Sequence, residues 1–194
     1  MNEFISRTKK ILVMPVEFFS SAEAQEGGKT RAFRYMACSF LFATILSYLM
    51  NVAIPFGGLI TINNMGKQPG PAVLLISHVV FYFFGLLVMF GNAGLWYLSI
   101  LIPSVLLKVN LNYTKLYQIL IYALVPAFLL GSFPYIKTAA FIWSFVLAII
   151  GFKCFYNVSY TKASIIIVVP VVLYIAISTI LLYSFLHLFH GLAS

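Results

Sequence analysis

The stretch Tyr122-Ala-Leu-Val-Pro126 lies near the middle of an apolar run, Leu116 to Phe133, that contains no charged residue. A proline inside a helix removes one backbone donor and clashes with the carbonyl four residues earlier, so this run predicts a helix with a kink at Pro126. A membrane tolerates such a helix, because neighbouring helices and side chains satisfy the freed backbone groups. We therefore predict a kinked transmembrane helix at the centre of the chain.

The residues that follow predict a hairpin and one more span. The turn Ser132-Phe-Pro-Tyr135 leads into a second apolar run, Ile136 to Phe152. A loop from Lys153 to Lys162 then precedes a last apolar run, which carries its own proline, Pro170. Runs of this length and apolarity are typical of membrane helices. We expect the rest of the chain to pack against this hairpin.

Composition supports the same class of protein. The 194 residues are 62% hydrophobic and 8% charged, and the mean hydropathy is +1.03. A water-soluble domain of this size could not hide so much apolar surface. The sequence therefore predicts an all-α polytopic membrane protein.

The distribution of charge limits the chemistry. The net charge is +8, and in a membrane protein basic residues gather in cytoplasmic loops near anionic headgroups. We therefore expect anionic membrane lipids as partners and no nucleic acid. No Gly-rich phosphate loop, nucleophile constellation or metal set is present, so we predict no enzyme, no cofactor and no metal. The four acids all lie in the first 26 residues: Glu3, Glu17, Glu23 and Glu26.

The apolar runs predict five spans. The second run, residues 72–107, has 36 residues and would be about 54 Å long as one helix, whereas the hydrocarbon core needs about 30 Å. We favour one long helix ending near Pro103, with Ser104 to Asn112 as an interfacial elbow; a break at Gly91-Asn92-Ala93-Gly94 stays open. The predicted spans are near residues 33–55, 74–102, 116–133, 136–152 and 164–188.

The basic residues set the orientation. With five spans, ten of the twelve lysines and arginines fall on one side, and splitting residues 72–107 into a hairpin leaves seven there. The positive-inside rule therefore favours five spans in a cell membrane, with a cytoplasmic N-terminus and an external C-terminus. The chain divides into a cytoplasmic leader, residues 1–31, and a five-span membrane domain, residues 32–194.

The leader predicts a short amphipathic helix. Phe4, Ile11 and Phe18 recur every seven residues with basic residues among them, a pattern typical of a helix that lies in the interface with its apolar side on the membrane. Pro15 would break this helix or begin a second one at its first position. We expect a loop from Glu23 to Gly28. An irregular cytosolic tail is the alternative.

Several short features, in order and spacing, resemble the Yip family, the multispanning proteins named for interaction with Ypt/Rab GTPases. The resemblance implies a five-helix bundle with a cytoplasmic N-terminus, and the short leader is similar to that of prokaryotic-type members. It implies a fold more firmly than a function. The features are Pro15-Val-Glu-Phe-Phe19, Tyr122-Ala-Leu-Val-Pro126, Trp143, Gly151-Phe152-Lys153, Ser159, Lys162-Ala163 and Pro170.

Lysines and tyrosines around the predicted cytoplasmic loops form the main candidate site. Tyrosines at this depth are typical of an aromatic belt, and together with lysines they can dock anionic lipid or a partner protein. We predict that this surface, the basic–aromatic rim, binds membrane lipids, another membrane protein or a second copy of the chain. Its residues are Lys108, Tyr113, Lys115, Tyr117, Lys153, Tyr156, Tyr160 and Lys162.

A second set of candidates lies inside the predicted spans. An ionisable residue such as His78 at that depth is a functional candidate, although we favour a neutral imidazole bonded to a nearby carbonyl or hydroxyl. A small solute or ion transporter or channel is the alternative function, and it requires a continuous polar path past Asn51, His78 and Asn92. The full set of intramembrane polar or kink residues is Asn51, His78, Asn92, Tyr122, Pro126 and Pro170.

Overall fold

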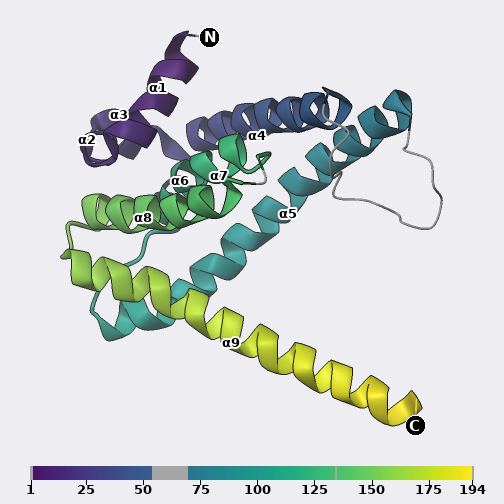
Figure 1. Ribbon diagram of the computed structural model, residues 1–194. Coiled ribbons are helices and arrows are strands. Elements are labelled where there is room, and N and C mark those ends of the chain that lie inside the picture. Colours follow the sequence, from purple (N-terminus) through teal and green to yellow (C-terminus); the bar gives the residue numbers. More distant parts are fainter. Residues whose placement is uncertain (1, 54–69, 134, 194) are drawn as a thin grey trace.

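A computed structural model describes residues 2–53, 70–133 and 135–193, which form helices and no strand (Figure 1). The predicted all-α architecture is confirmed for these residues. The helices are α1 (Asn2–Val13), α2 (Pro15–Ser20), α3 (Ala22–Gln25), α4 (Gly28–Ala53), α5 (Pro71–Leu106), α6 (Tyr113–Ala123), α7 (Val125–Leu130), α8 (Lys137–Tyr156) and α9 (Tyr160–Ala193).

The leader is divided at Pro15, as the sequence predicts. The helix α1 ends at Val13, and Pro15 opens α2, where its missing N–H would have no intrahelical partner. The predicted loop from Glu23 to Gly28 is too long, since α3 occupies its first part. The reason is a cap: the Ser21 hydroxyl accepts a hydrogen bond from the backbone N–H of Ala24 over 3.4 Å.

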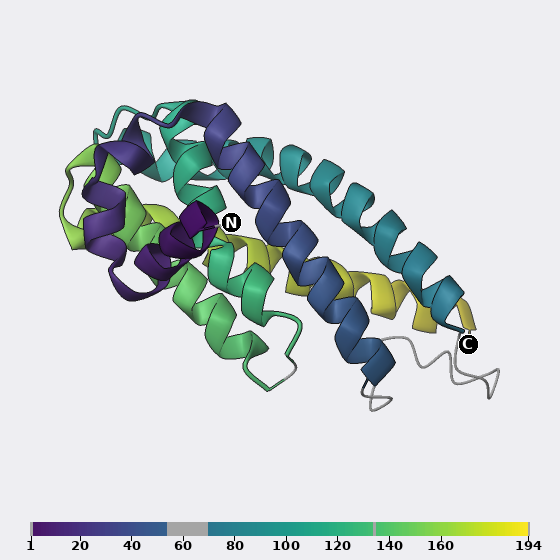
Figure 2. The same cartoon turned by 90° about the horizontal axis from the view of Figure 1, so that it is seen from above.

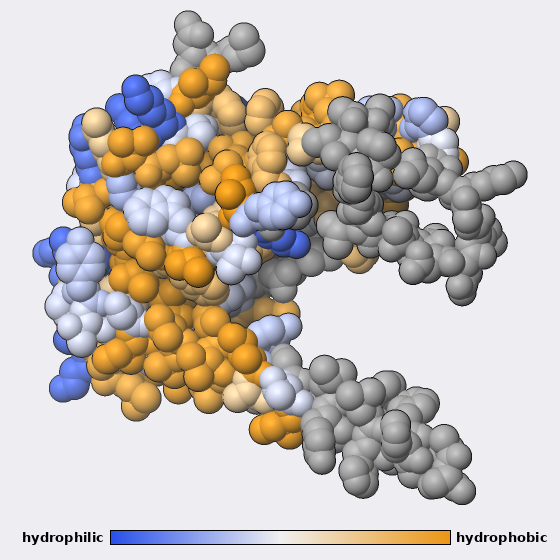
Figure 3. Space-filling model, in the orientation of Figure 1, coloured by the Kyte–Doolittle hydropathy of each residue, from blue (hydrophilic) through white to orange (hydrophobic). Residues whose placement is uncertain are grey.

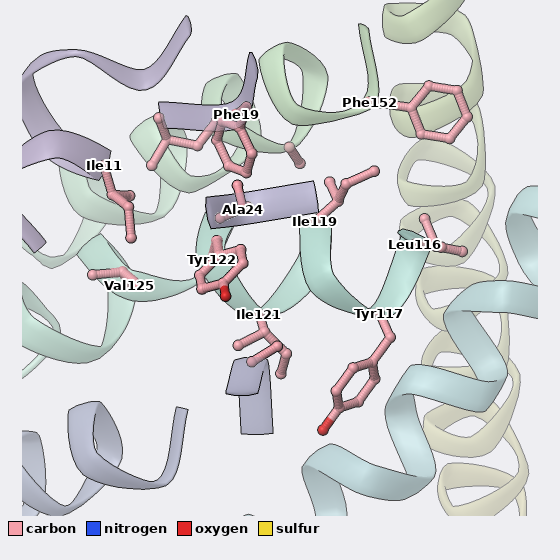
Figure 4. Close-up of a cluster of buried hydrophobic side chains, with 14 of the residues drawn as sticks. Ile11, Phe19, Ala24, Leu116, Tyr117, Ile119, Ile121, Tyr122, Val125 and Phe152 are labelled. Carbon is pink, nitrogen blue, oxygen red and sulfur yellow. The ribbon is translucent and has the colours of Figure 1, made fainter. Parts of the chain in front are cut away.

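The apolar side of the leader packs on protein, which differs from the expected contact with headgroups. Ile11 and Phe19 are 0% exposed and Phe18 is 1% exposed. The Phe18 ring meets the Tyr122 ring edge-to-face at 5.0 Å between centroids. Figure 4 shows Ile11 and Phe19 within the same cluster as Tyr122. The leader is therefore part of the helical core. Its treatment as a separate unit, residues 1–31, stays a prediction.

The long helix α5 is continuous from Pro71 to Leu106 and runs through the Gly91–Gly94 segment without a break. It extends one turn beyond the predicted end and holds Pro103 inside that last turn. It packs on α4 through Phe40, whose ring stacks on Tyr82 at 5.6 Å. A Cβ on Gly85 would approach the Phe40 ring to 2.5 Å, so only glycine permits this approach.

The kink near Pro126 is present as a break between two helices. The helix α6 ends at Ala123, and α7 begins at Val125 after the single residue Leu124. The neighbouring helix α8 satisfies a backbone group that the break leaves free, because the Ser144 hydroxyl accepts a hydrogen bond from the Ala127 N–H over 3.3 Å. A side chain of a packed helix thus stabilises the kink, as expected for a membrane segment.

Ser144→Ala is expected to lower the free energy of unfolding by about 1–2 kcal/mol, because a buried N–H loses its acceptor. Ser99→Ala is the matched control, since the exposed Ser99 hydroxyl bonds only to a carbonyl of its own helix. Thermal unfolding in detergent micelles, followed by circular dichroism, measures both variants. Equal stability of the two variants would show that Ser144 does not support the kink.

Helices extend further into the predicted loops than expected. The predicted loop from Lys153 to Lys162 shrinks to residues 157–159, and the elbow of residues 104–112 shrinks to residues 107–112. Asn112 and Asn157, which lie in the predicted loops, cap the start of α6 and the end of α8. Asn157 closes α8 in the left-handed conformation, with φ of 50°, a position that asparagine tolerates well.

Three helical segments within the described residues are long and apolar enough to cross a membrane: Gly28–Met50, Tyr113–Leu130 and Lys137–Tyr156. The segment Tyr113–Leu130 includes the break between α6 and α7. Parts of α5 and α9 add shorter apolar stretches. Hydrophobic residues cover much of the face shown in Figure 3. The chain is a multi-pass membrane protein.

The connectivity brings several helix ends to one side of the molecule. The starts of α4, α6 and α9 and the ends of α5 and α8 lie together at the left of Figure 1, and the view from above in Figure 2 agrees. The opposite ends of α4 and α5 point away from this side. This shared end holds the candidate site.

Candidate functional site

Four lysines of the basic–aromatic rim lie on segments that meet at this shared end. Lys108 belongs to the elbow after α5, and Lys115 to the first turn of α6. Lys153 lies in the last turn of α8, where a positive charge is favourable beside the helix carbonyl ends. Lys162 lies in the first turn of α9. The fold therefore gathers charges that are more than 50 residues apart in the sequence.

Tyr156 holds the elbow in place. Its hydroxyl accepts a hydrogen bond from the Asn112 N–H over 3.1 Å and donates one to the Asn112 carbonyl over 2.9 Å. Its ring stacks on Phe152 at 4.5 Å. The Asn112 side chain caps α6 by accepting from the N–H groups of Thr114 and Lys115. The elbow is thus clamped between α6 and the end of α8.

The lysines of this end meet aromatic rings. Lys153 Nζ lies 4.6 Å from the centroid of Tyr160, and Lys115 Nζ lies 5.9 Å from that of Tyr156. Such cation–π contacts hold a cation without neutralising it. The ion pairs found among the described residues involve neither Lys115 nor Lys153, so these lysines keep their positive charge available to an anion.

Two residues outside the predicted set join the site. Lys29 Nζ lies 4.5 Å from the centroid of the Tyr113 ring, and the Tyr97 ring meets Tyr113 edge-to-face at 5.4 Å. Both come from other helices, so their proximity to Tyr113 was not visible in the sequence spacing. Charge alone could have suggested Lys29, because it precedes the first predicted span.

Tyr117 is the predicted rim residue that the structure places elsewhere. It is 5% exposed and belongs to the core, whereas Tyr113, one helical turn earlier, is exposed. Its hydroxyl has no hydrogen-bond partner among the described residues. Figure 4 shows the Tyr117 ring on the inner side of α6. Tyr117 packs helices together and offers no surface to a partner.

Two shallow cavities adjoin at the elbow and share Asn110 and Leu111. The first, of about 390 Å³, is lined by residues 97, 101 and 105 of α5 and by the elbow residues 108–111. The second, of about 490 Å³, is lined by residues 110–112, Lys115 and residues 155–157 at the end of α8. The surface of the rim is therefore concave at the elbow.

Among the intramembrane candidates, His78 has a polar partner, whereas the buried Tyr122 hydroxyl has no hydrogen-bond partner among the described residues. His78 Nδ1 lies 2.8 Å from the Leu74 carbonyl, and its ring meets Tyr48 edge-to-face at 5.7 Å. Tyr122, Pro126 and Pro170 are buried.

The side chains of Asn51 and Asn92 lie outside the described residues, so the polar path that a transporter requires stays a prediction. Neither of the two cavities at the elbow is lined by His78.

A partly buried polar cluster around Arg7 was not predicted from the sequence. The Arg7 guanidinium donates to Glu3 and to Glu23, each over 2.8 Å, and lies 5.6 Å from the Tyr35 ring centroid. The Tyr35 and Thr8 hydroxyls are 2.7 Å apart. The spacing of Glu3 and Arg7 on one helical face could have suggested the first pair. The cluster joins the leader to α4 through Tyr35. The carboxylates of Glu3 and Glu23 are both paired with Arg7.

Comparison with known proteins gives one family. The family model described as Yip1 domain matches residues 9–192, which is nearly the whole chain. The match includes the hairpin of α6, α7 and α8 and all residues of the rim. No curated protein and no solved structure matches the chain.

Proposed function

The chain belongs to the Yip1 domain family, and from this premise we propose that it is a non-enzymatic membrane protein whose basic–aromatic rim binds anionic lipid headgroups. The observation that carries the proposal is the convergence of Lys108, Lys115, Lys153 and Lys162 at one end of the molecule. Lysines near a membrane surface attract anionic lipids by about 1 kcal/mol each.

We place this end at the cytoplasmic face of a cell membrane, with five spans, a cytoplasmic N-terminus and an external C-terminus. Supporting this topology, α5 has 36 residues and α9 has 34, and each is longer than the roughly 20 residues that a span needs. The positive-inside rule orients the basic end toward the cytoplasm.

Lipid is favoured over a protein partner by the chemistry of the rim. Exposed lysines supported by tyrosine rings offer point charges without a complementary apolar hot spot, whereas protein interfaces are centred on buried apolar anchors. Tyr113 and Tyr160 are exposed, and tyrosine is suited to the headgroup layer because its ring is apolar and its hydroxyl polar. A membrane-protein partner or a second copy remains an outcome of the test.

Lys→Gln at all four rim lysines is expected to abolish most of the preference for anionic lipid, because each lost charge weakens the attraction about fivefold. The measurement is electron paramagnetic resonance of spin-labelled phosphatidylglycerol and phosphatidylcholine in vesicles that contain the reconstituted protein. The wild-type preference for phosphatidylglycerol should also fall as salt is raised.

The control replaces two leader lysines, Lys9 and Lys10, by glutamine. This change removes positive charge at a distance from the elbow. The rim variant removes four charges and the control two, so an equal loss per removed charge would reduce the effect to net charge. A wild-type protein without preference for phosphatidylglycerol would overturn the proposal. If cross-linking in native membranes then captures a protein that the rim variant loses, the rim binds protein instead.

A further inference from the structure

The elbow between α5 and α6 carries two adjoining cavities, one more polar and one more apolar, which share Asn110 and Leu111 and are together called the depression. We propose that this depression is a specific site for one anionic phospholipid, with the phosphate at Asn110–Leu111 and one acyl chain along α5. The proposal rests on the proposed function, since it names one site within the rim, but it makes a separate claim. General attraction by charge needs no particular lining residue, whereas a site does.

The cavity beside α6 suits a phosphate. It is lined by Lys115, Asn110, Asn112 and Asn157, together with Leu111, Phe155 and Tyr156, and by no acidic residue. Lys115 Nζ lies 3.5 Å from the Phe155 carbonyl, at the long limit of a hydrogen bond. Its remaining donors are therefore free to meet an anion. A lysine is a common point-charge ligand for phosphate.

The cavity beside α5 suits an acyl chain. Leu101 and Val105 line it, and the α5 surface around it continues with Leu98 at 60% and Ile102 at 68% exposed. In a membrane-spanning helix such an exposed apolar face contacts lipid tails. Lys108 also lines this cavity. Asn110 and Leu111 line both cavities, so the apolar half of a phospholipid would lie beside α5 and its charged half beside α6.

Lys108 occupies a position where glycine is usual. The Lys108 N–H bonds to the Val105 carbonyl and the Val109 N–H to the Ser104 carbonyl, which is the bond pattern of a Schellman cap. Lys108 has φ of 57°, a left-handed conformation that disfavours residues with a Cβ. Strain kept at such a position indicates that the side chain has a role beyond the turn. Lys108 is exposed and is one of the residues that line the depression.

A lipid rather than free phosphate is the occupant that fits both halves. The depression adjoins the apolar outer face of α5, and phosphate alone would leave the Leu101–Val105 wall uncovered. A bilayer supplies phospholipid at this face at high local concentration. We therefore commit to an anionic diacyl phospholipid from the surrounding membrane.

Lys108→Gly tests the charged residue that lines the cavity beside α5. The full chain is reconstituted with equal phosphatidylglycerol and phosphatidylcholine, extracted in mild detergent and weighed by native mass spectrometry. Wild type should retain one phosphatidylglycerol. Lys108→Gly should lower its occupancy about fivefold, although the fold becomes more stable because glycine relieves the left-handed turn. Reduced binding therefore cannot be attributed to unfolding.

Leu101→Trp tests the apolar half, because the indole fills the cavity beside α5 while every lysine stays in place. Leu98→Trp is its matched control, since Leu98 is an exposed leucine of the same helix that does not line the cavity. We expect loss of the retained lipid in Leu101→Trp and retention in Leu98→Trp. Equal retention in both would overturn the placement of the acyl chain, and with it the site.

Lys162→Gln separates the site from the general attraction of the rim. Lys162 lies at the same end but lines neither cavity. Its loss should weaken the overall preference for anionic lipid in vesicles while one phosphatidylglycerol stays bound. If Lys162→Gln and Lys108→Gly lower the occupancy equally, the specific site is wrong and the proposed function stands. If wild type shows no preference for anionic lipid in vesicles, the proposed function fails as well.

Discussion

Phe19→Ala is expected to lower the free energy of unfolding by about 3–5 kcal/mol, the range for truncating a buried phenylalanine. The Phe19 ring is 0% exposed and meets the Phe155 ring edge-to-face at 6.2 Å. Its removal leaves a cavity between the leader and the hairpin that surrounding helices cannot close without moving. Thermal unfolding in detergent micelles measures the loss.

The matched control is Phe84→Ala. Phe84 is a phenylalanine of α5 with 61% of its surface exposed, so its truncation creates no cavity. If the leader lay on the membrane surface with its apolar side in the headgroups, Phe19 would also have few protein contacts. The two variants would then be equally stable, and the docking of the leader in the core would be wrong.

Gly151→Leu is expected to destabilise the fold by about 1–3 kcal/mol, the range for overpacking a core. A Cβ at Gly151 would lie 3.0 Å from Phe19 Cε1 and 3.0 Å from Ile119 Cγ2. A leucine side chain therefore cannot enter unless the leader withdraws. Thermal unfolding and the rate of tryptic cleavage after Lys9 and Lys10 should both report this withdrawal.

Gly94→Leu is the control for the change from glycine to leucine in a helix. No described atom lies within 4 Å of a Cβ at Gly94, so this variant should be unchanged or stabilised by up to about 1 kcal/mol through helix propensity. Gly151→Leu is thus expected to lower the free energy of unfolding, and Gly94→Leu is expected to leave it unchanged or raise it.

A double variant adds a direct test of contact. Phe19→Ala removes the ring that Gly151→Leu would strike, so the pair should be less destabilised than the sum of its members, as for residues that share a packing space. Additive losses would mean that Phe19 and Gly151 do not touch.

These contacts give a physical reason for two of the sequence features that resemble the Yip family. Gly151 stands in the Gly151-Phe152-Lys153 feature and Phe19 in the Pro15-Val-Glu-Phe-Phe19 feature. In the sequence the two features are separate signatures. In the structure the Phe19 ring occupies space that a side chain at Gly151 would need. The position of the ring therefore depends on a glycine at residue 151.

The rim was predicted from charge, and its arrangement followed only from the fold. Positive residues beside helix ends could be assigned to one side because each span reverses the chain. The side chains that contact these basic residues could not be predicted in this way. Tyr113 and Tyr117 are one turn apart on α6, yet Tyr113 is exposed and Tyr117 is buried, because only Tyr113 lies at the helix end. The contact of Lys29 with Tyr113 joins residues 84 positions apart, so no local sequence pattern predicts it.

The sequence by itself determined the membrane class, the all-α class, the break at Pro15 and the kink near Pro126, because each depends on local composition or on the backbone of one residue. The tertiary structure decided what covers each apolar face. The periodicity of Ile11 and Phe18 shows that one side of the leader is apolar, but headgroups and the hairpin can both cover such a side. The hairpin covers it because the aromatic rings around Tyr122, the gap at Gly151 and the pairing of Arg7 with Glu23 fit one another only in three dimensions.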